Sequence, residues 1–192
     1  MKAELHYKLN RIINEIWDAV VLPVFAPKLR TAISKKLSRS SNDKKKICFV
    51  CTGNICRSPF SHYQFPKFGS RLEIDSAGIF AGNGKPADPT AKSVASKFSV
   101  DLQFHRTKPL TEEIVSENDL ILVMEPWQLV RIWAKFPGSR GKAFLLSTLL
   151  REKLRTWSIA DPFDRGPEHF KEIFGVLVAA NEELQRISKQ IP

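Results

Sequence analysis

Residues 50–59, VCTGNICRSP, join a short apolar run to a helix-like stretch, and this junction constrains the fold more than any other segment. The run that precedes it, at 47–50, predicts a buried strand, and Ser58 and Pro59 suit the first turn of a helix. Between Cys51 and Arg57 lie five residues whose backbone N–H groups can point inward, and a helix N-terminus adds positive potential. The junction therefore predicts a cradle for a dianion such as phosphate.

Three side chains of this loop carry the expected chemistry. Cys51 lies at the floor of the cradle, where N–H donors and the helix terminus stabilise a thiolate that can attack phosphorus in line. Arg57 can bind two oxygens of the transferred group through its planar guanidinium, and the Ser58 hydroxyl can donate to the sulfur. The pattern therefore predicts phosphoryl transfer through Cys51, with a buried, inert cysteine as the structural alternative.

The other residues of the predicted phosphate-binding loop shape its backbone. Gly53 permits an inward turn without a Cβ, and Asn54 tolerates the left-handed conformation and can brace the loop through its side chain. The full set between the nucleophile and the arginine is Thr52, Gly53, Asn54, Ile55 and Cys56.

From Lys46 onward, strand-like and helix-like segments alternate. Strands are expected at 47–51, 72–76, 119–124 and 143–146, and helices at 58–68, 89–98, 127–135 and 168–187. Repeated βα units predict an α/β fold, here a four-stranded parallel sheet with helices on both faces. Ligands of such sheets bind at the carboxyl ends of the strands, which is where the loop with Cys51 lies.

We place a domain boundary before this alternating region, so that 1–45 forms a basic amphipathic helical extension and linker and 46–192 the catalytic domain. Apolar residues recur at helical spacing over 4–25, and Pro23 and Pro27 are expected to interrupt that helix.

Beyond those prolines, 29–37 predicts a second basic helix and 38–46 a solvated linker. The apolar face of the extension has two open interpretations: it packs on its own domain, or it docks on a membrane surface or a partner. The residues of that face are Ile13, Ile16, Trp17 and Val20.

The charge of the chain is concentrated in the extension. Residues 1–46 contain eleven Lys/Arg against four Asp/Glu, a balance of +7 within a total of +10. The basic composition therefore does not indicate a nucleic-acid partner for the catalytic domain. No apolar run approaches a membrane span, and the N-terminal pattern is not that of a secretory signal, so a cytoplasmic location is expected.

The spacing of the cysteines and histidines indicates neither a disulfide-linked scaffold nor a metal site. The three cysteines, Cys48, Cys51 and Cys56, lie within nine residues, which suits a reducing compartment. His6, His62 and His169 show no metal-like clustering, and we expect no metal and no cofactor.

The sequence resembles the low-molecular-weight protein tyrosine phosphatases from about Lys46 to its end. The resemblance rests on VCTGNICRSP, Asp75–Gly78, Ala87–Pro89, DLILVME at 119–125 and Ala160–Phe163. It implies a four-stranded parallel sheet and a metal-independent enzyme that hydrolyses phosphotyrosine in proteins.

The resemblance also assigns roles outside the loop. An Asp before Pro is typical of a turn, but the family places its general acid in the segment that matches Asp161-Pro162-Phe163. Phe163 then matches an aromatic wall of the pocket. Gly82 occupies the position where relatives carry a bulky second wall, which leaves Phe80 either as a substitute wall or as an anchor of its own loop.

Supporting roles follow from the same resemblance. Ser76 and His105 match residues of the hydrogen-bond network around the loop asparagine. Cys56 matches a redox partner that forms a reversible disulfide with the nucleophile and protects it from over-oxidation, with a small buried residue as the alternative. Cys48 is expected in the core.

Two other activities remain alternatives. Relatives that act on phosphoarginine carry threonine where this chain has Ile55, and an isoleucine favours an aromatic leaving group. Arsenate reduction needs downstream cysteines, and none follows Cys56. A non-catalytic phosphate-binding docking module is disfavoured because it needs neither the nucleophile nor the acid, Asp161.

The loop pattern is closer to bacterial members, several of which oppose tyrosine kinases of capsule or exopolysaccharide assembly. By analogy the expected partner is a phosphotyrosine protein, with a membrane tyrosine kinase as the specific candidate. Because such kinases lie at the membrane, the extension could hold a cytoplasmic phosphatase at the membrane periphery.

Overall fold

A four-stranded parallel sheet forms the centre of the computed structural model, which describes residues 2–38, 44–65, 72–150 and 156–189. Its strands lie in the order β2-β1-β3-β4, and all three neighbouring pairs are parallel. They are β1 (Lys45–Cys51), β2 (Leu72–Gly78), β3 (Leu120–Val123) and β4 (Ala143–Leu145). The predicted α/β class and the parallel sheet are therefore confirmed.

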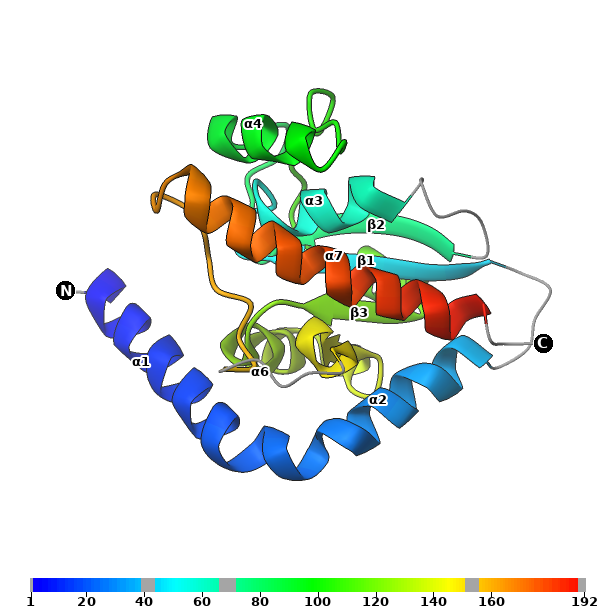
Figure 1. Cartoon of the computed structure of the whole chain (residues 1–192). Helices are drawn as coiled ribbons and strands as arrows, with labels where there is room; N and C mark the ends of the chain where they lie inside the picture. The colour runs from blue at the N-terminus through cyan, green and yellow to red at the C-terminus, as the bar shows by residue number, and fades with distance from the viewer. Residues whose placement is uncertain (1, 39–43, 66–71, 151–155, 190–192) are drawn as a thin grey trace.

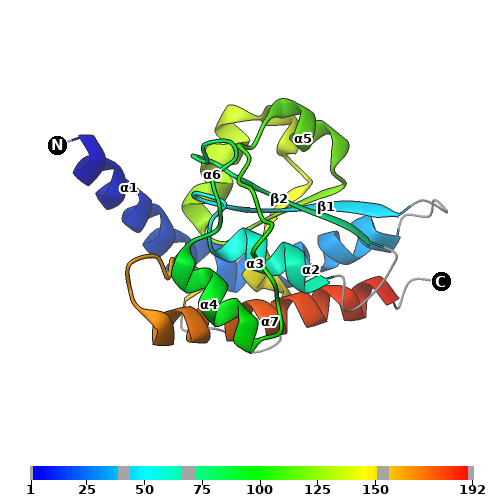
Figure 2. The same cartoon turned by 90° about the horizontal axis from the view of Figure 1, so that it is seen from above.

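Helices cover both faces of the sheet, as Figure 2 shows. One face carries α3 (Arg57–Gln64), α4 (Pro89–Lys97) and α7 (Pro167–Lys189), and the other α5 (Glu112–Glu117) and α6 (Pro126–Lys135). Alternating strand residues supply the two cores: Phe49 and Leu122 point into the first, Val50 and Val123 into the second. Short 3₁₀ turns, η3 (Pro137–Ser139) and η4 (Leu146–Leu149), flank β4.

Most predicted elements agree with the structure to within a few residues. The sequence missed α5, whose N-cap Thr111 accepts a hydrogen bond from the Ile114 N–H. The expected end of the helix at Phe68 and most of the expected linker lie outside the described residues.

The extension forms a bent helical rod (Figure 1), made of α1 (Lys2–Ile16), a π turn η1 (Trp17–Val21) and α2 (Leu22–Ser38). The prediction that Pro23 and Pro27 interrupt the helix is wrong, because α2 runs through both. Pro23 lies in the first turn of α2, directly after the π turn, and Pro27 removes one backbone hydrogen bond without ending the helix. The irregularity lies earlier, at the π turn.

The second half of the rod belongs to the core. Ile33 and Leu37 are buried with residues of α7 and η4, and the Arg30 guanidinium donates to the Leu149 carbonyl at 3.3 Å and pairs with Glu183. The first half contacts α6, and the Trp17 ring meets Trp133 at a centroid distance of 5.8 Å. The extension therefore packs on its own domain along part of its surface.

The burial of α2 can be tested with Ile33→Ala. The Ile33 side chain is 0% exposed, so its truncation should lower the free energy of unfolding by about 2–5 kcal/mol. Thr31→Ala is the control, since Thr31 is exposed on the same helix and should change it by no more than about 0.5 kcal/mol. Equal effects of the two substitutions in chemical denaturation would contradict the packing of α2.

Candidate active site

The loop between β1 and α3 turns its carbonyl oxygens away from the enclosed side. The carbonyls of Cys51, Thr52 and Ile55 accept from the N–H groups of Ile79, Phe80 and Asp88 at 2.9–3.0 Å. The Asn54 carbonyl accepts from His105 Nε2 at 2.7 Å. Because a trans peptide points its N–H opposite to its C=O, the N–H groups that follow these four carbonyls face inward. They belong to Thr52, Gly53, Ile55 and Cys56.

Asn54 braces this loop from its middle. Its φ of 55° is the left-handed conformation predicted from the sequence. Its side-chain amide donates to Ser58 Oγ at 2.9 Å and to Ser76 Oγ at 3.1 Å, and its oxygen accepts from the Lys108 N–H at 3.0 Å. The predicted supporting residues Ser76 and His105 therefore both contact Asn54.

Ser58 links that brace to the predicted nucleophile. Cys51 Sγ lies 3.0 Å from Ser58 Oγ, and both side chains are buried. Since Asn54 already donates to the Ser58 oxygen, the single Ser58 proton points to the sulfur or to the Ala77 carbonyl, which is farther away at 3.3 Å. The shorter contact favours donation to Cys51, which stabilises a thiolate.

Arg57, the first residue of α3, holds a buried guanidinium that is 1% exposed. One terminal nitrogen donates to Glu125 Oε1 at 2.7 Å and to the Ile159 carbonyl at 2.8 Å. The other donates to Asp161 Oδ2 at 2.6 Å and to Thr52 Oγ1 at 3.3 Å. The arginine therefore joins the loop, the start of α6 and the segment before α7.

The charge state of this arginine is secured by its partners. Burial alone would lower the pKa of Arg57, but the carboxylates of Glu125 and Asp161 outweigh burial and raise it. Arg57 Nε has no hydrogen-bond partner among the described residues, so it can still donate to an oxyanion.

Asp161 is half-buried at the open side of the phosphate-binding loop, which we call the mouth of the site. Its second oxygen accepts from the Phe163 N–H at 3.3 Å. Phe163 is exposed in the turn that follows. Phe80 is also exposed; its ring stacks on Trp127 at 6.2 Å, with the Arg131 guanidinium 4.5 Å from its centroid. Phe80 therefore lies on the α6 side of the loop, and Trp127 and Arg131 of α6 hold its ring in place.

Two neutral histidines, His62 and His105, lie beside the network of hydrogen bonds around Asn54. Burial lowers the pKa of His62 to about 4, and burial also lowers the pKa of His105 despite its bond to Asn54. Since a carbonyl accepts hydrogen bonds, His105 donates to Asn54 through a protonated Nε2. His62, which the sequence analysis did not assign to the site, lies with Nδ1 3.4 Å from Ser76 Oγ.

The other cysteines are free and buried. Burial, together with the neighbouring Cys51, raises the pKa of the Cys56 thiol, so Cys56 is protonated in the folded protein. Its role as a redox partner stays a prediction. Cys48 lies in the core as expected.

Glu125 is the main contributor that the sequence analysis missed. It lies two residues after the end of β3 and directly before Pro126 at the start of α6, so the carboxyl end of a central strand places it beside the loop. Gln128, three residues later, donates to Thr52 Oγ1 at 3.3 Å. The sequence signal that could have identified Glu125 is an acidic residue between a predicted strand and a proline that starts a helix.

The structure requires glycine at position 78 rather than at position 53, where the sequence predicted it. A Cβ at Gly53 would lie 3.4 Å from Ile55 Cγ1, an ordinary contact, so the protein itself leaves room there. A Cβ at Gly78 would lie 2.8 Å from the Asn54 nitrogen and 2.9 Å from the Gly53 carbonyl carbon. The close approach of β2 to the loop, rather than the loop itself, requires glycine.

Within the described ranges, no group of three or more His, Cys, Asp or Glu side chains is arranged to hold a metal ion. The donors gathered at the loop are N–H groups and a guanidinium, which suit an anion.

Comparison with known proteins gives a consistent match for this arrangement. The family described as low molecular weight phosphotyrosine protein phosphatase matches residues 46–191. Etp, a low molecular weight protein-tyrosine-phosphatase of Escherichia coli strain K12, is 36% identical over 144 residues, which cover 74% of this chain and 95% of Etp.

Solved structures agree. The tyrosine phosphatase Wzb from Escherichia coli K30, in complex with sulphate, superposes with a TM-score of 0.69 at 33% identity, over 74% of this chain and 97% of Wzb. The YwlE arginine phosphatase from Geobacillus stearothermophilus also gives a TM-score of 0.69, at 30% identity over 74% of this chain and 91% of YwlE.

Two glycine substitutions test the loop geometry. Gly78→Ala should push the loop out of shape and weaken phosphate binding by about 10-fold or more, because overpacking against backbone costs about 1–3 kcal/mol. Gly82→Ala is the matched control, since its Cβ would meet the flexible Lys85 side chain at 3.3 Å, and should change affinity by less than about 2-fold. Equal phosphate affinities of the two variants in calorimetric titration would contradict this account.

Proposed function

We propose that this chain, which belongs to the low molecular weight phosphotyrosine protein phosphatase family and is a protein-tyrosine phosphatase, works through a phosphorylated Cys51. The observation that carries the proposal is the buried Cys51 sulfur beside a hydroxyl donor, in a loop that also contains Arg57. In the first step the thiolate attacks phosphorus, the S–P bond forms, and the bond to the tyrosine oxygen breaks.

Asp161 supplies the proton for this step, after it has left Arg57 and taken up a proton from solvent. A phenolate leaving group must be protonated, and Asp161 lies at the mouth, 2.6 Å from the arginine that binds the phosphoryl group. In the second step the Asp161 carboxylate takes a proton from water, which attacks phosphorus and releases phosphate and the Cys51 thiolate. One carboxyl group thus serves as acid and then as base.

Arg57 changes partners during this cycle. Its bonds to Glu125 and Ile159 lie on one terminal nitrogen, while its bond to Asp161 lies on the other. An incoming phosphate dianion competes with Asp161 for that second nitrogen and for Nε, and so releases Asp161 toward the leaving oxygen. Glu125 keeps the guanidinium in place meanwhile.

Phosphotyrosine is the proposed substrate in preference to phosphoarginine. Ile55 is half-buried in the loop and offers apolar contact to an aromatic ring, and the exposed Phe163 and Phe80 are the proposed walls. The arginine phosphatase YwlE shares the fold, so comparing phosphotyrosine with phosphoarginine peptides is the decisive assay. Faster turnover of phosphoarginine would favour the alternative.

As partner we propose a membrane tyrosine kinase or its phosphorylated products, by analogy with bacterial members of the family. A protein of this kind carries phosphotyrosine near the bilayer, and the extension offers a way to remain there. Among the helices of the described ranges, none combines the length and apolarity needed to cross a bilayer.

The extension presents an apolar stripe that the domain does not cover. Its six side chains are 49–69% exposed and recur every three or four residues along α1 and into α2. Four-residue steps drift around an α-helix of 3.6 residues per turn, and the wider π turn η1 counteracts that drift. The stripe consists of Leu5, Leu9, Ile12, Ile16, Val20 and Val24.

We propose an anionic membrane surface as the occupant of this stripe, with the protein at the cytoplasmic membrane periphery. The balance of +7 over residues 1–46 lies entirely at 28–46, because basic and acidic residues cancel over 1–24. The basic part of the extension complements anionic headgroups, and the stripe supplies the apolar face of an interfacial helix. A second copy of the chain would share the same positive charge and repel.

Substitution of Asp161 tests the proposed mechanism. Asp161→Ala should lower kcat for phosphotyrosine by ~100-fold or more, and less for p-nitrophenyl phosphate, whose leaving group needs little protonation. Cys51→Ser should abolish turnover of both substrates. An equal loss on both substrates would remove Asp161 as the acid, and no metal-free turnover by the wild type would favour a docking module.

Vesicle sedimentation tests the membrane surface. The full chain should bind vesicles that contain phosphatidylglycerol, bind phosphatidylcholine vesicles less, and lose binding in high salt. Ile16→Asp should lower binding, whereas Phe104→Asp, at a residue 82% exposed outside the extension, should not. Binding unaffected by Ile16→Asp, or a dimer in light scattering that Ile16→Asp dissociates, would overturn the proposal.

A further inference from the structure

The N-terminal extension reaches the arginine of the active site through a chain of hydrogen bonds. Asn14, on the packed side of α1, donates from Nδ2 to Glu125 Oε2 at 3.3 Å. The other oxygen of Glu125 accepts from Arg57 Nη1 at 2.7 Å. A single carboxylate therefore connects a residue of the extension to the guanidinium that binds phosphate in the proposed function.

Asn14 also caps α6. Its Oδ1 accepts from the Trp127 N–H at 3.1 Å, in the first turn of that helix, where backbone donors lack intrahelical partners. Pro126 has no N–H, and the Gln128 N–H is bonded to the Glu125 carbonyl at 3.0 Å. The amide of Asn14 thus holds both the side chain of Glu125 and the helix turn that follows it.

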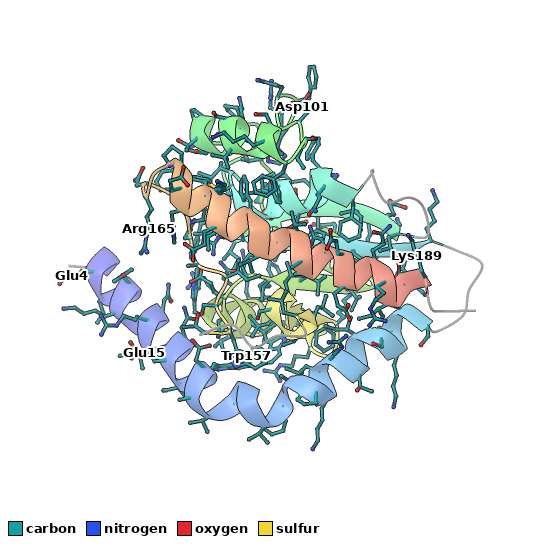
Figure 3. The ribbon with its side chains drawn as sticks, viewed as in Figure 1. Glu4, Glu15, Asp101, Trp157, Arg165 and Lys189 are labelled. Atoms are coloured by element: carbon teal, nitrogen blue, oxygen red, sulfur yellow. The ribbon has the colours of Figure 1, made fainter. Side chains whose placement is uncertain are left out.

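A second contact ties the extension to the segment that ends in Asp161. The Asp18 carboxylate accepts from the Trp157 N–H at 2.8 Å. Figure 3 shows Glu15 on the rod and Trp157 on that neighbouring segment. Two residues after Trp157, the Ile159 carbonyl accepts from Arg57. The rod therefore supports both protein groups that bind the first terminal nitrogen of Arg57.

We propose that Asn14 is a positioning residue for Arg57, acting through Glu125, and that the extension is thereby part of the catalytic apparatus. The Glu125 side chain is 14% exposed, so water does little to satisfy its second oxygen if the amide is removed. Without Asn14 the second oxygen of Glu125 loses its donor, and only Arg57 and the Gln128 amide, at 3.3 Å from Oε1, still hold the carboxylate. Arg57 then has a less firmly oriented carboxylate partner when Asp161 leaves. The family match begins at residue 46, after Asn14.

The proposal rests on the proposed phosphatase function and is tested in the full chain with phosphotyrosine. Asn14→Ala should lower kcat/KM by about 10-fold and weaken inhibition by inorganic phosphate by a similar factor. Asn10→Ala, one turn away on α1, is the control, since Asn10 makes no side-chain hydrogen bond to a described residue. It should leave both values unchanged.

Asn14→Asp separates the two contacts of Asn14. The aspartate can still accept from Trp127, but it cannot donate to Glu125 and repels it, so activity should be at least as low as for Asn14→Ala. Recovery of activity in Asn14→Asp would mean that the cap of α6 alone matters, and would overturn the proposal.

A double-mutant cycle gives the final criterion. Glu125→Gln leaves a single acceptor oxygen, which the charged Arg57 guanidinium takes, so that the new amide NH2 faces Asn14 and cannot accept from it. Adding Asn14→Ala should therefore cause no further loss of kcat/KM. Additive losses, or equal phosphate inhibition of wild type and Asn14→Ala, would contradict the coupling. Absence of turnover in the wild type would instead refute the phosphatase function, and calorimetric phosphate binding by Asn14→Ala would still decide the positioning role.

Discussion

The buried guanidinium of Arg57 is the constraint on which the rest of the structure depends. A charge that is 1% exposed is tolerated only when opposite charges and hydrogen-bond acceptors surround it, and here its two terminal nitrogens have two carboxylates, a carbonyl and a hydroxyl. These partners come from the β1–α3 loop, from Glu125 at the start of α6 and from the segment around Asp161. Their convergence brings the carboxyl ends of β1 and β3 into one site.

The two carboxylates around Arg57 differ in what surrounds them, and this difference suits the proposed cycle. Glu125 is largely buried and held by Asn14, whereas Asp161 is more exposed at the mouth. A phosphate dianion that enters the loop can displace the exposed partner and leave the buried one in place. The arginine thus keeps its orientation while Asp161 becomes available to the leaving group, as the proposed mechanism requires.

The sequence predicted the loop and the sheet because local rules determine both: an apolar run, a left-handed Asn54 and a helix start. It did not predict Glu125 as a partner of Arg57, because that contact depends on how β3 lies beside β1, a long-range pairing. It also placed a break at Pro27, since proline rules are local while the packing of α2 on α7 is tertiary. The contact between Asn14 and Glu125 could not be predicted either, because it depends on how α1 packs against α6.

The most direct measurement is to trap the proposed intermediate. Wild-type protein is mixed with a phosphotyrosine peptide, quenched in acid during turnover, digested and analysed by mass spectrometry. The account predicts one phosphoryl group on the peptide that contains Cys51, formed before free phosphate accumulates. A phosphoryl group on another residue, or release of phosphate at full rate with no labelled Cys51 peptide at any time, would contradict it.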